Sequence, residues 1–130
     1  MPGMSRSELV AMRFNEMINA RDLDGLGTLM TDDHTFVDAA GQAVVGRTAC
    51  LAAWRGFFAG FPSYRNEFES VRSSGETVVI TGRSHCAELT ELAGPALWTA
   101  ETEGDLVRVW QVYEDTRAAR HRLGIGATAP

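Results

Sequence analysis

The sequence predicts an α+β fold, a cone-shaped roll in which three N-terminal helices pack on a curved, mainly antiparallel sheet and enclose a pocket. Before residue 62, apolar residues recur at helical spacing, with one short break into a hairpin. From residue 64 onward the apolar period is close to two, and turn residues divide this stretch into four strands. At 130 residues the chain has the size of one domain, 1–130, with an ordered core expected at about 7–124.

The first two helices are predicted from apolar stripes. An amphipathic helix of about 13 residues is indicated by Val10, Phe14, Met17 and Ile18. Asp22 can cap a second, shorter helix. Its buried stripe comprises Leu23, Leu26, Leu29 and Met30. Because Gly25 and Gly27 lower its intrinsic stability, this helix must depend on packing.

A hairpin and a third helix follow. Residues 35–45 predict a short hairpin, because β-branched and aromatic residues flank a turn at 39–41. Thr48 can cap the third helix, and Pro62 ends it. The buried face of this helix is heavily aromatic and comprises Leu51, Trp54, Phe57, Phe58 and Phe61.

The C-terminal half predicts a four-strand antiparallel meander. Its strands are expected at 64–72, 76–88, 96–103 and 106–114. The Gly104-Asp105 link is the strongest hairpin signal of the chain. Residues 117–123 indicate a frayed helical turn, and a tail of Gly, Ala and Pro follows. Three helices can cover one face of the sheet, so the other face needs a polar surface or a partner, and we expect a homodimer.

Composition narrows the partners and the compartment. The net charge of −5 is scattered, and no Lys/Arg cluster offers a surface for nucleic acid or an anionic membrane. No stretch approaches the roughly 20 apolar residues of a membrane span. Residues 1–7 lack the basic start and apolar run of a signal peptide, so a cytoplasmic location is expected. Cys50 and Cys86 are expected to be buried thiols rather than a disulfide.

Three stretches of the sequence carry a family resemblance. Residues 19–26, NARDLDGL, and residues 32–38, DDHTFVD, resemble the NAGDLDG…DDATVED stretch of bacterial ketosteroid isomerases. Residues 104–110, GDLVRVW, are similar to the closing hairpin of the same superfamily. From about residue 7 to residue 124 the chain therefore resembles the nuclear transport factor 2 superfamily, which includes ketosteroid isomerases, scytalone dehydratases and SnoaL-like polyketide cyclases. The resemblance implies the cone-shaped roll but no single activity, because this fold hosts many chemistries.

The resemblance also assigns residues singly. Asp38 falls on the proton-shuttling base of the isomerases. Their oxyanion-hole tyrosine falls on Phe14, which has no hydroxyl, and their second donor, a neutral acid, falls near Trp98 or Thr99. In SnoaL-like cyclases the acid–base aspartate follows a tryptophan of the last strand, a position held here by Gln111. Neither a steroid isomerase nor a standard cyclase is therefore expected.

Asp38 is the first catalytic candidate. A carboxylate at the mouth of an apolar pocket is poorly solvated, which makes it a useful base. Two alternatives stay open: Asp38 can line the pocket without doing chemistry, or it can be an ordinary turn aspartate, since residues 38–41 are also good turn chemistry.

His85 is the second catalytic candidate. The resemblance turns it inward beside Thr81 and Arg83, where it could donate to a carbonyl oxygen or exchange a proton. The alternative is a hydrogen-bonded core histidine or one at the dimer face. His34 and Asp38 share a strand face but lie four residues, about 13 Å, apart, so they cannot chelate one metal. The sequence predicts no metal and no cofactor.

The predicted substrate-binding residues are aromatic or amide side chains: Phe14, Trp54, Phe58, Trp98, Gln111 and Tyr113. Gln111 and Tyr113 should share a face of the last strand, which the resemblance turns inward. For the aromatic residues the alternative is a purely structural place in the core.

Two functions compete. The first is a cofactor-independent enzyme in which Asp38 moves a proton on a hydrophobic carbonyl compound, in an isomerisation, cyclisation, dehydration or epoxide opening. The second is a non-catalytic module on the same fold that binds a small hydrophobic ligand or a protein. Asp38 favours the first, whereas Phe14 and Gln111 at the vacated positions favour the second.

Overall fold

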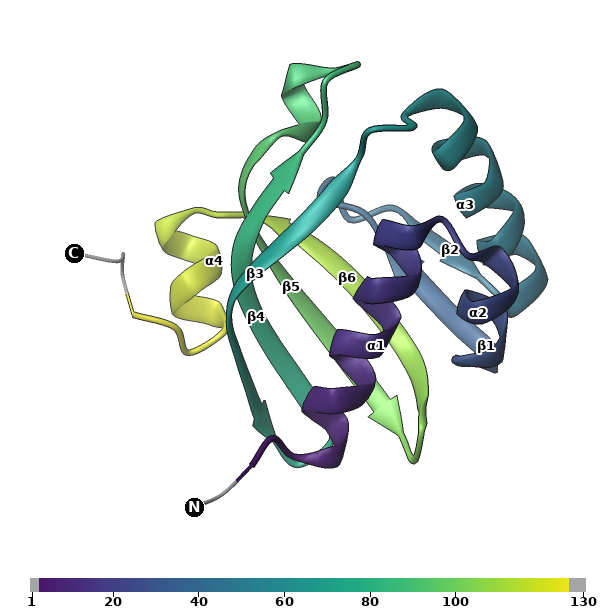
Figure 1. The fold of residues 1–130 in the computed structure, drawn as a ribbon. Coiled ribbons are helices and arrows are strands. Elements are labelled where there is room, and N and C mark those ends of the chain that lie inside the picture. The colour runs from purple at the N-terminus through teal and green to yellow at the C-terminus, as the bar shows by residue number, and fades with distance from the viewer. Residues whose placement is uncertain (1–2, 127–130) are drawn as a thin grey trace.

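The computed structural model describes residues 3–126 and has the predicted α+β architecture, with a fourth helix near its C-terminal end (Figure 1). The helices are α1 (Arg6–Ala20), α2 (Leu23–Thr28), α3 (Arg47–Gly60) and α4 (Arg117–Arg122), with a 3-10 turn η1 (Thr90–Leu92). The strands are β1 (Met30–Val37), β2 (Ala43–Val45), β3 (Arg65–Ser74), β4 (Thr77–His85), β5 (Gly94–Glu103) and β6 (Leu106–Glu114). Residues 1–2 and 127–130, part of the predicted N-terminal segment and tail, lie outside the described residues.

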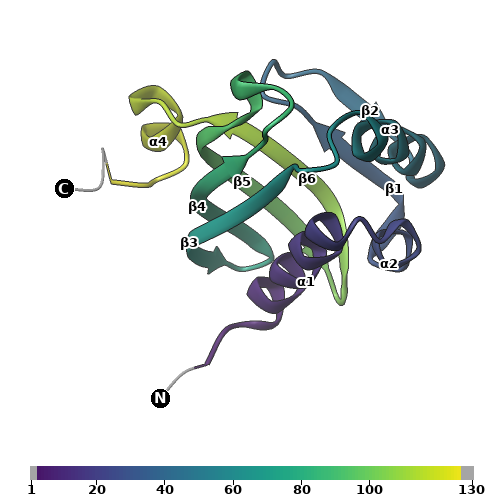
Figure 2. The same ribbon diagram turned by 45° about the horizontal axis from the view of Figure 1, so that its top comes forward.

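The six strands form one curved sheet in the order β2-β1-β6-β5-β4-β3. β1 and β6 run parallel, and all other neighbours are antiparallel. Helices α1 and α3 lie on the concave side of the sheet, whereas α4 lies on the opposite side (Figures 1 and 2). The sheet is therefore mainly antiparallel, as the sequence predicts, and its concave side holds the core.

Several predicted boundaries are wrong. The first and third meander strands are two residues longer at one end than predicted, with bounds Arg65–Ser74 and Gly94–Glu103. Three further differences have a clear structural basis. Met30 starts β1 and pairs with Val107 instead of belonging to the second helix. The sequence could not decide this, because a single apolar residue after a short helix is compatible with the helical period and with the strand period. The third helix begins directly after Gly46, which has φ 100° and makes no side-chain capping bond, so Thr48 lies inside the helix. The second meander strand ends at His85 rather than at residue 88.

The core is one continuous cluster that contains Phe14, Trp54 and Phe58, the core position that the sequence leaves open as the alternative for these aromatic residues. Phe14 of α1 is fully buried, and its ring centroid lies 4.7 Å from that of Trp110 on β6. Trp54 and Phe58, four residues apart on α3, have ring centroids 5.4 Å apart. The aromatic stripes of two helices thus meet the concave face of the sheet.

Both cysteines are buried, as predicted: Cys50 lies in α3 and Cys86 follows β4. Across residues 3–126, no helix combines the length and the apolar content needed to cross a membrane.

The outer face of the sheet is partly covered by the chain itself. The segment predicted as a frayed turn forms α4, which Thr116 caps through a hydrogen bond from the Ala119 N–H. Leu97, on the outer face of β5, is fully buried. Residues 123–125, after α4, border one shallow depression together with Val79 and Thr81 of β4.

Candidate functional site

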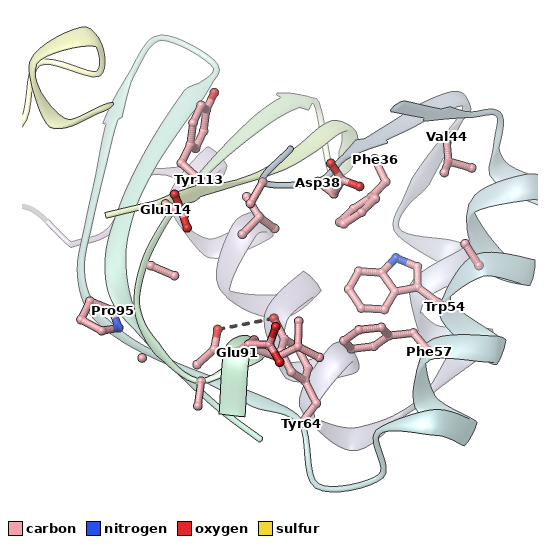
Figure 3. Close-up of a pocket in the computed structure, with 18 of the residues that line it drawn as sticks. Phe36, Asp38, Val44, Trp54, Phe57, Tyr64, Glu91, Pro95, Tyr113 and Glu114 are labelled. Atoms are coloured by element: carbon pink, nitrogen blue, oxygen red, sulfur yellow. Dashed lines mark hydrogen bonds between the residues drawn. The ribbon is translucent and has the colours of Figure 1, made fainter. Parts of the chain in front are cut away.

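A cavity of about 420 Å³ opens at one end of the sheet (Figure 3). Its lining comes from α3, from the adjoining ends of β1, β4, β5 and β6, and from the loop that contains η1. Within the described chain, no α1 residue lines it. Helix α1 instead covers the other end of the concave face, where Phe14 and Trp110 fill the space.

Aromatic side chains form one wall of the cavity. Trp54 and Phe57 are three residues apart on α3, so both can face the same side. The ring of Trp54 lies 5.4 Å from that of Phe36 and 5.8 Å from that of Phe57. Trp54 is 7% exposed, and its indole N–H has no hydrogen-bond partner among the described residues. The nitrogen itself is closed off from solvent, so a ligand oxygen can accept from it only if the ring turns. Such a bond would be favourable, because a buried donor without a partner costs about 1–3 kcal/mol.

Asp38 stands at the mouth of this cavity, directly after β1. Its Oδ1 accepts hydrogen bonds from the backbone N–H groups of Ala40 and Gln42, each at 2.9 Å. These bonds are those of a turn aspartate, one of the predicted alternatives. Its Oδ2 accepts none from the described residues, and the side chain is half-buried. Asp38 is thus both a turn residue and a lining residue.

Tyr64 was not among the predicted site residues, yet it faces the cavity across from Asp38 (Figure 3). Its hydroxyl lies 3.4 Å from the Ser84 Oγ, and Ser84 in turn donates to the Asn66 Oδ1 at 2.8 Å. A serine has one hydroxyl proton, so the phenol is the donor between Tyr64 and Ser84. Burial raises the pKa of Tyr64, and the phenol therefore stays protonated near neutrality.

His85 lies on the outer face of β4, so its predicted inward orientation is wrong. Val78 and Ile80 are fully buried on the inner face, and Ser84 continues that phase toward the cavity. His85 is out of phase with them, and its Nε2 lies 3.0 Å from a carboxylate oxygen of the exposed Glu67. The structure does not bring His85 to Asp38.

Gln111 and Tyr113 share a face as predicted, but it is also the outer face, because Trp110 is the inward neighbour. The Tyr113 hydroxyl lies 3.2 Å from the Thr99 Oγ1. Tyr113 borders the cavity at its edge, and its hydroxyl points away from Trp54 (Figure 3).

Of the four predicted phenylalanine and tryptophan residues, Trp54 lines the cavity and the other three pack in the core. Phe14 and Trp98 are fully buried, and the Phe58 ring packs against that of Trp54 at a tilt of 32°. Helical spacing identified the aromatic face of α3 but could not separate its core part from its cavity part.

A comparison with protein families matches residues 11–121 to the SnoaL-like domain. The chain belongs to the SnoaL-like domain family. No curated protein matches the sequence.

Solved structures resemble this SnoaL-like domain at low sequence identity. A Shewanella putrefaciens protein described as a SnoaL-like polyketide cyclase is 18% identical, with a TM-score of 0.76 over 85% of this chain and 90% of its own. An LEH-like epoxide hydrolase from M. tuberculosis is 12% identical, with a TM-score of 0.73 over 86% of this chain and 84% of its own. A Catenulispora acidiphila protein with a ketosteroid isomerase-like fold, solved with trimethylamine, is 21% identical, with a TM-score of 0.69 over 93% of this chain and 97% of its own. At these identities the likeness establishes the fold.

Proposed function

We propose that this SnoaL-like domain is an enzyme that binds a small, mostly apolar carbonyl compound and moves a proton on it with Asp38. One observation carries the proposal: a carboxylate oxygen without a described partner stands at the mouth of a cavity whose wall holds an unpartnered indole N–H. A base and a hydrogen-bond donor on one cavity are the two groups that proton abstraction beside a carbonyl needs.

The cavity walls support binding of an apolar body. Phe36, Trp54, Phe57 and Val112 give the ligand apolar contact. Each Å² of apolar surface removed from water contributes about 25 cal/mol, so a small ligand in this cavity is held mainly by its apolar contacts. The few polar groups in the cavity then set its orientation.

The chemical step balances within this set of groups. The Asp38 carboxylate takes a proton from the carbon beside the carbonyl, and the electron pair moves onto the carbonyl oxygen. The Trp54 N–H donates a hydrogen bond to that oxygen, or the neutral Tyr64 phenol does so after leaving the Ser84 Oγ, and this bond stabilises the enolate. The proton on Asp38 exchanges with solvent, and its return to the same carbon gives hydrogen exchange. In a substrate with a carbon–carbon double bond conjugated to the enolate, its return to the far end of that double bond gives isomerisation. The names of the similar structures, a polyketide cyclase and an epoxide hydrolase, fit acid–base chemistry on such substrates.

The second candidate function is a non-catalytic ligand-binding module. The two backbone bonds to the Oδ1 of Asp38 favour it, because they give this carboxylate a structural role in the turn. Phe14 in the core and Gln111 on the outer face also lack the chemistry of the family positions that they resemble.

The test is hydrogen–deuterium exchange beside the carbonyl of 4-phenylbutan-2-one, followed by NMR in D₂O. We expect the protein to accelerate this exchange and Asp38→Asn to reduce the acceleration at least about 100-fold. Asparagine keeps a carbonyl oxygen for the Ala40 and Gln42 N–H groups, so the fold and the affinity for the ketone should change little. The matched control is Asp24→Asn, which removes an exposed carboxylate from α2 and should leave the exchange unchanged.

Binding measured by titration of the same ketone separates the two functions. Binding without exchange in the unchanged protein would reject the enzyme and leave the binding module. Exchange that survives Asp38→Asn would reject Asp38 as the base.

A further inference from the structure

Three carboxylates border the mouth of the cavity, and each comes from a different part of the chain. Asp38 follows β1, Glu114 ends β6, and Glu91 lies in η1 between β4 and β5. Because β1 and β6 are parallel neighbours, their C-terminal ends lie at the same edge of the sheet. Ala96, near the start of β5, pairs with Glu114, so the loop that carries Glu91 enters the sheet at this edge as well.

These three carboxylates, Asp38, Glu91 and Glu114, form the rim of the cavity, and no positively charged side chain pairs with them among the described residues. The cavity lining contains no Lys, Arg or His from residues 3–126. The ion pairs between described residues do not include Asp38, Glu91 or Glu114. Carboxylates of one sign at the mouth of a low-dielectric cavity repel an anionic ligand and attract a cation.

The wall behind the rim suits the same kind of ligand. Phe36, Trp54 and Phe57 are mutually packed aromatic rings on the cavity surface, and aromatic faces attract organic cations, quaternary ammonium groups above all. Trp54 is also an unpartnered polar side chain that is more than nine-tenths buried, and its nitrogen is turned toward the side of Phe36 and Asp38 (Figure 3). The N–H has no acceptor among the described residues, so a ligand that carries an oxygen as well as a cationic group gains a hydrogen bond if the indole ring turns to expose this nitrogen.

We infer that the substrate is an organic cation, a hydrophobic protonated or quaternary amine whose apolar body carries a carbonyl oxygen. This inference rests on the proposed function, because it assigns the charge of the substrate of the same cavity. The ammonium group lies at the rim beside Glu91 and Glu114, and the body extends inward past Trp54. Asp38 then adds to the attraction as well as serving as the base.

The experiment compares three probes that share a phenylethyl group and differ in the charge of the head group. They are phenethyltrimethylammonium, 4-phenylbutan-2-one and 3-phenylpropanoate, titrated into the full chain by calorimetry at low salt. We expect the cation to bind about tenfold more tightly than the ketone and the anion to bind most weakly, because several carboxylates act together on one charge. Raising the salt concentration to 0.5 M should reduce the advantage of the cation, because exposed charges are screened.

The variant that tests the rim is the double substitution Glu91→Gln and Glu114→Gln, which keeps the size of both side chains. It should weaken cation binding about tenfold and change ketone binding less than about twofold. The matched control is Glu103→Gln, which removes the same kind of exposed carboxylate from the opposite end of β5.

The outcomes separate this inference from the proposed function. Equal binding of the cation and the ketone, or an equal loss of cation binding in Glu103→Gln, would overturn the cationic substrate while ketone exchange still supported the enzyme. Failure of all three probes to bind would overturn both.

Discussion

His34 is a titratable residue that the fold buries in the core, away from the cavity. Its Nδ1 donates to the carbonyl oxygen of Val107 at 2.7 Å, and its ring lies 5.5 Å from that of Phe14. The Nε2 has no partner among the described residues, and the side chain is fully buried. Burial lowers the pKa of His34, and the Val107 carbonyl and the charge of Asp33 oppose this effect only in part. The folded protein therefore holds a neutral imidazole.

This burial predicts a loss of stability in mild acid. The unfolded chain binds a proton at a pKa of about 6.5, whereas folded His34 binds it at lower pH, so the unfolded state is favoured as the pH falls below about 6.5. The stability that this group contributes is complete above about pH 6.5 and decreases toward its folded pKa, by at most about 1.4 kcal/mol per pH unit. His34→Asn keeps an N–H near the position of Nδ1 and cannot titrate.

The measurement is urea unfolding between about pH 5 and 7.5. His34→Asn should be less stable at pH 7.5 but should show a flatter slope below about pH 6.5. His121→Asn, at an exposed histidine of α4, should keep the slope of the unchanged protein. An identical slope in His34→Asn would contradict the assignment.

At the scale of elements, α1 is tied to the edge strand β3 by a small polar network. The Asn19 side chain accepts from the Asn66 backbone N–H at 2.8 Å and donates to its carbonyl oxygen at 2.9 Å, as a neighbouring strand would. The Asn66 side chain donates to Asn15 at 3.2 Å and accepts from Ser84 at 2.8 Å. The network therefore covers the sheet edge and also positions the serine that the Tyr64 phenol contacts.

Asn66→Ala should destabilise the fold by about 2–3 kcal/mol, because it leaves Asn15 and Ser84 buried without their partner. Asn66→Ala should also weaken ligand binding, because Ser84, which the Tyr64 phenol contacts, loses the partner that positions it. The control is Ser70→Ala, whose hydroxyl pairs with Thr81 at 2.7 Å on the exposed face of the same two strands. That change should cost less than about 0.5 kcal/mol in thermal or urea unfolding. Equal costs for the two variants would refute the network.

Gly82 allows β3 and β4 to approach closely where the sheet bends. A Cβ at this position would lie against the carbonyl oxygen of Glu67 and 2.9 Å from the Phe68 Cα, beside the register shift between Phe68 and Ser70. Gly82→Ala should therefore cost at least about 2 kcal/mol in the free energy of unfolding. Gly56→Ala, at an open position of α3, should stabilise by about 0.5–1 kcal/mol. If Gly82→Ala leaves the free energy of unfolding unchanged, β3 and β4 can move apart at this point without a loss of stability.

The strands also show what the sequence could predict. Its period placed β6 correctly at 106–114, and Gly104 and Asp105 form the expected hairpin link. The predicted orientation of the side chains on the strands was wrong. A shift of the alignment by one residue moves every side chain of a strand to the opposite face of the sheet. In β4 the apolar residues Val78 and Ile80 indicate the correct inner face, whereas the family resemblance places His85 on that face and is wrong.

At the scale of the molecule, the helices divide the concave face into a filled end and an open end. Helix α1 fills one end with Phe14, whereas α3 stands over the other and leaves the cavity. Periodicity predicts helices, strands and the core, because those depend on local patterns. It could not find Tyr64, Glu91 or Glu114 as cavity residues, because they meet only where strand ends and a loop converge around the curvature of the sheet.

The outer face of the sheet leads to the last prediction, a homodimer. Helix α4 and the residues after it cover the part of this face around Thr81 of β4. The surface around Gln111 of β6 is then the part that a second copy can cover. Sedimentation at micromolar concentration should show twice the mass of 14.2 kDa. Gln111→Arg places a charge on that surface and should shift the protein to monomer, because an unpaired charge buried in an interface costs several kcal/mol. Arg55→Glu, on the exposed side of α3, should leave the dimer intact. If the unchanged protein is a monomer, the homodimer prediction is wrong. Helix α4 and the polar side chains of the strands would then be sufficient to cover the outer face of the sheet.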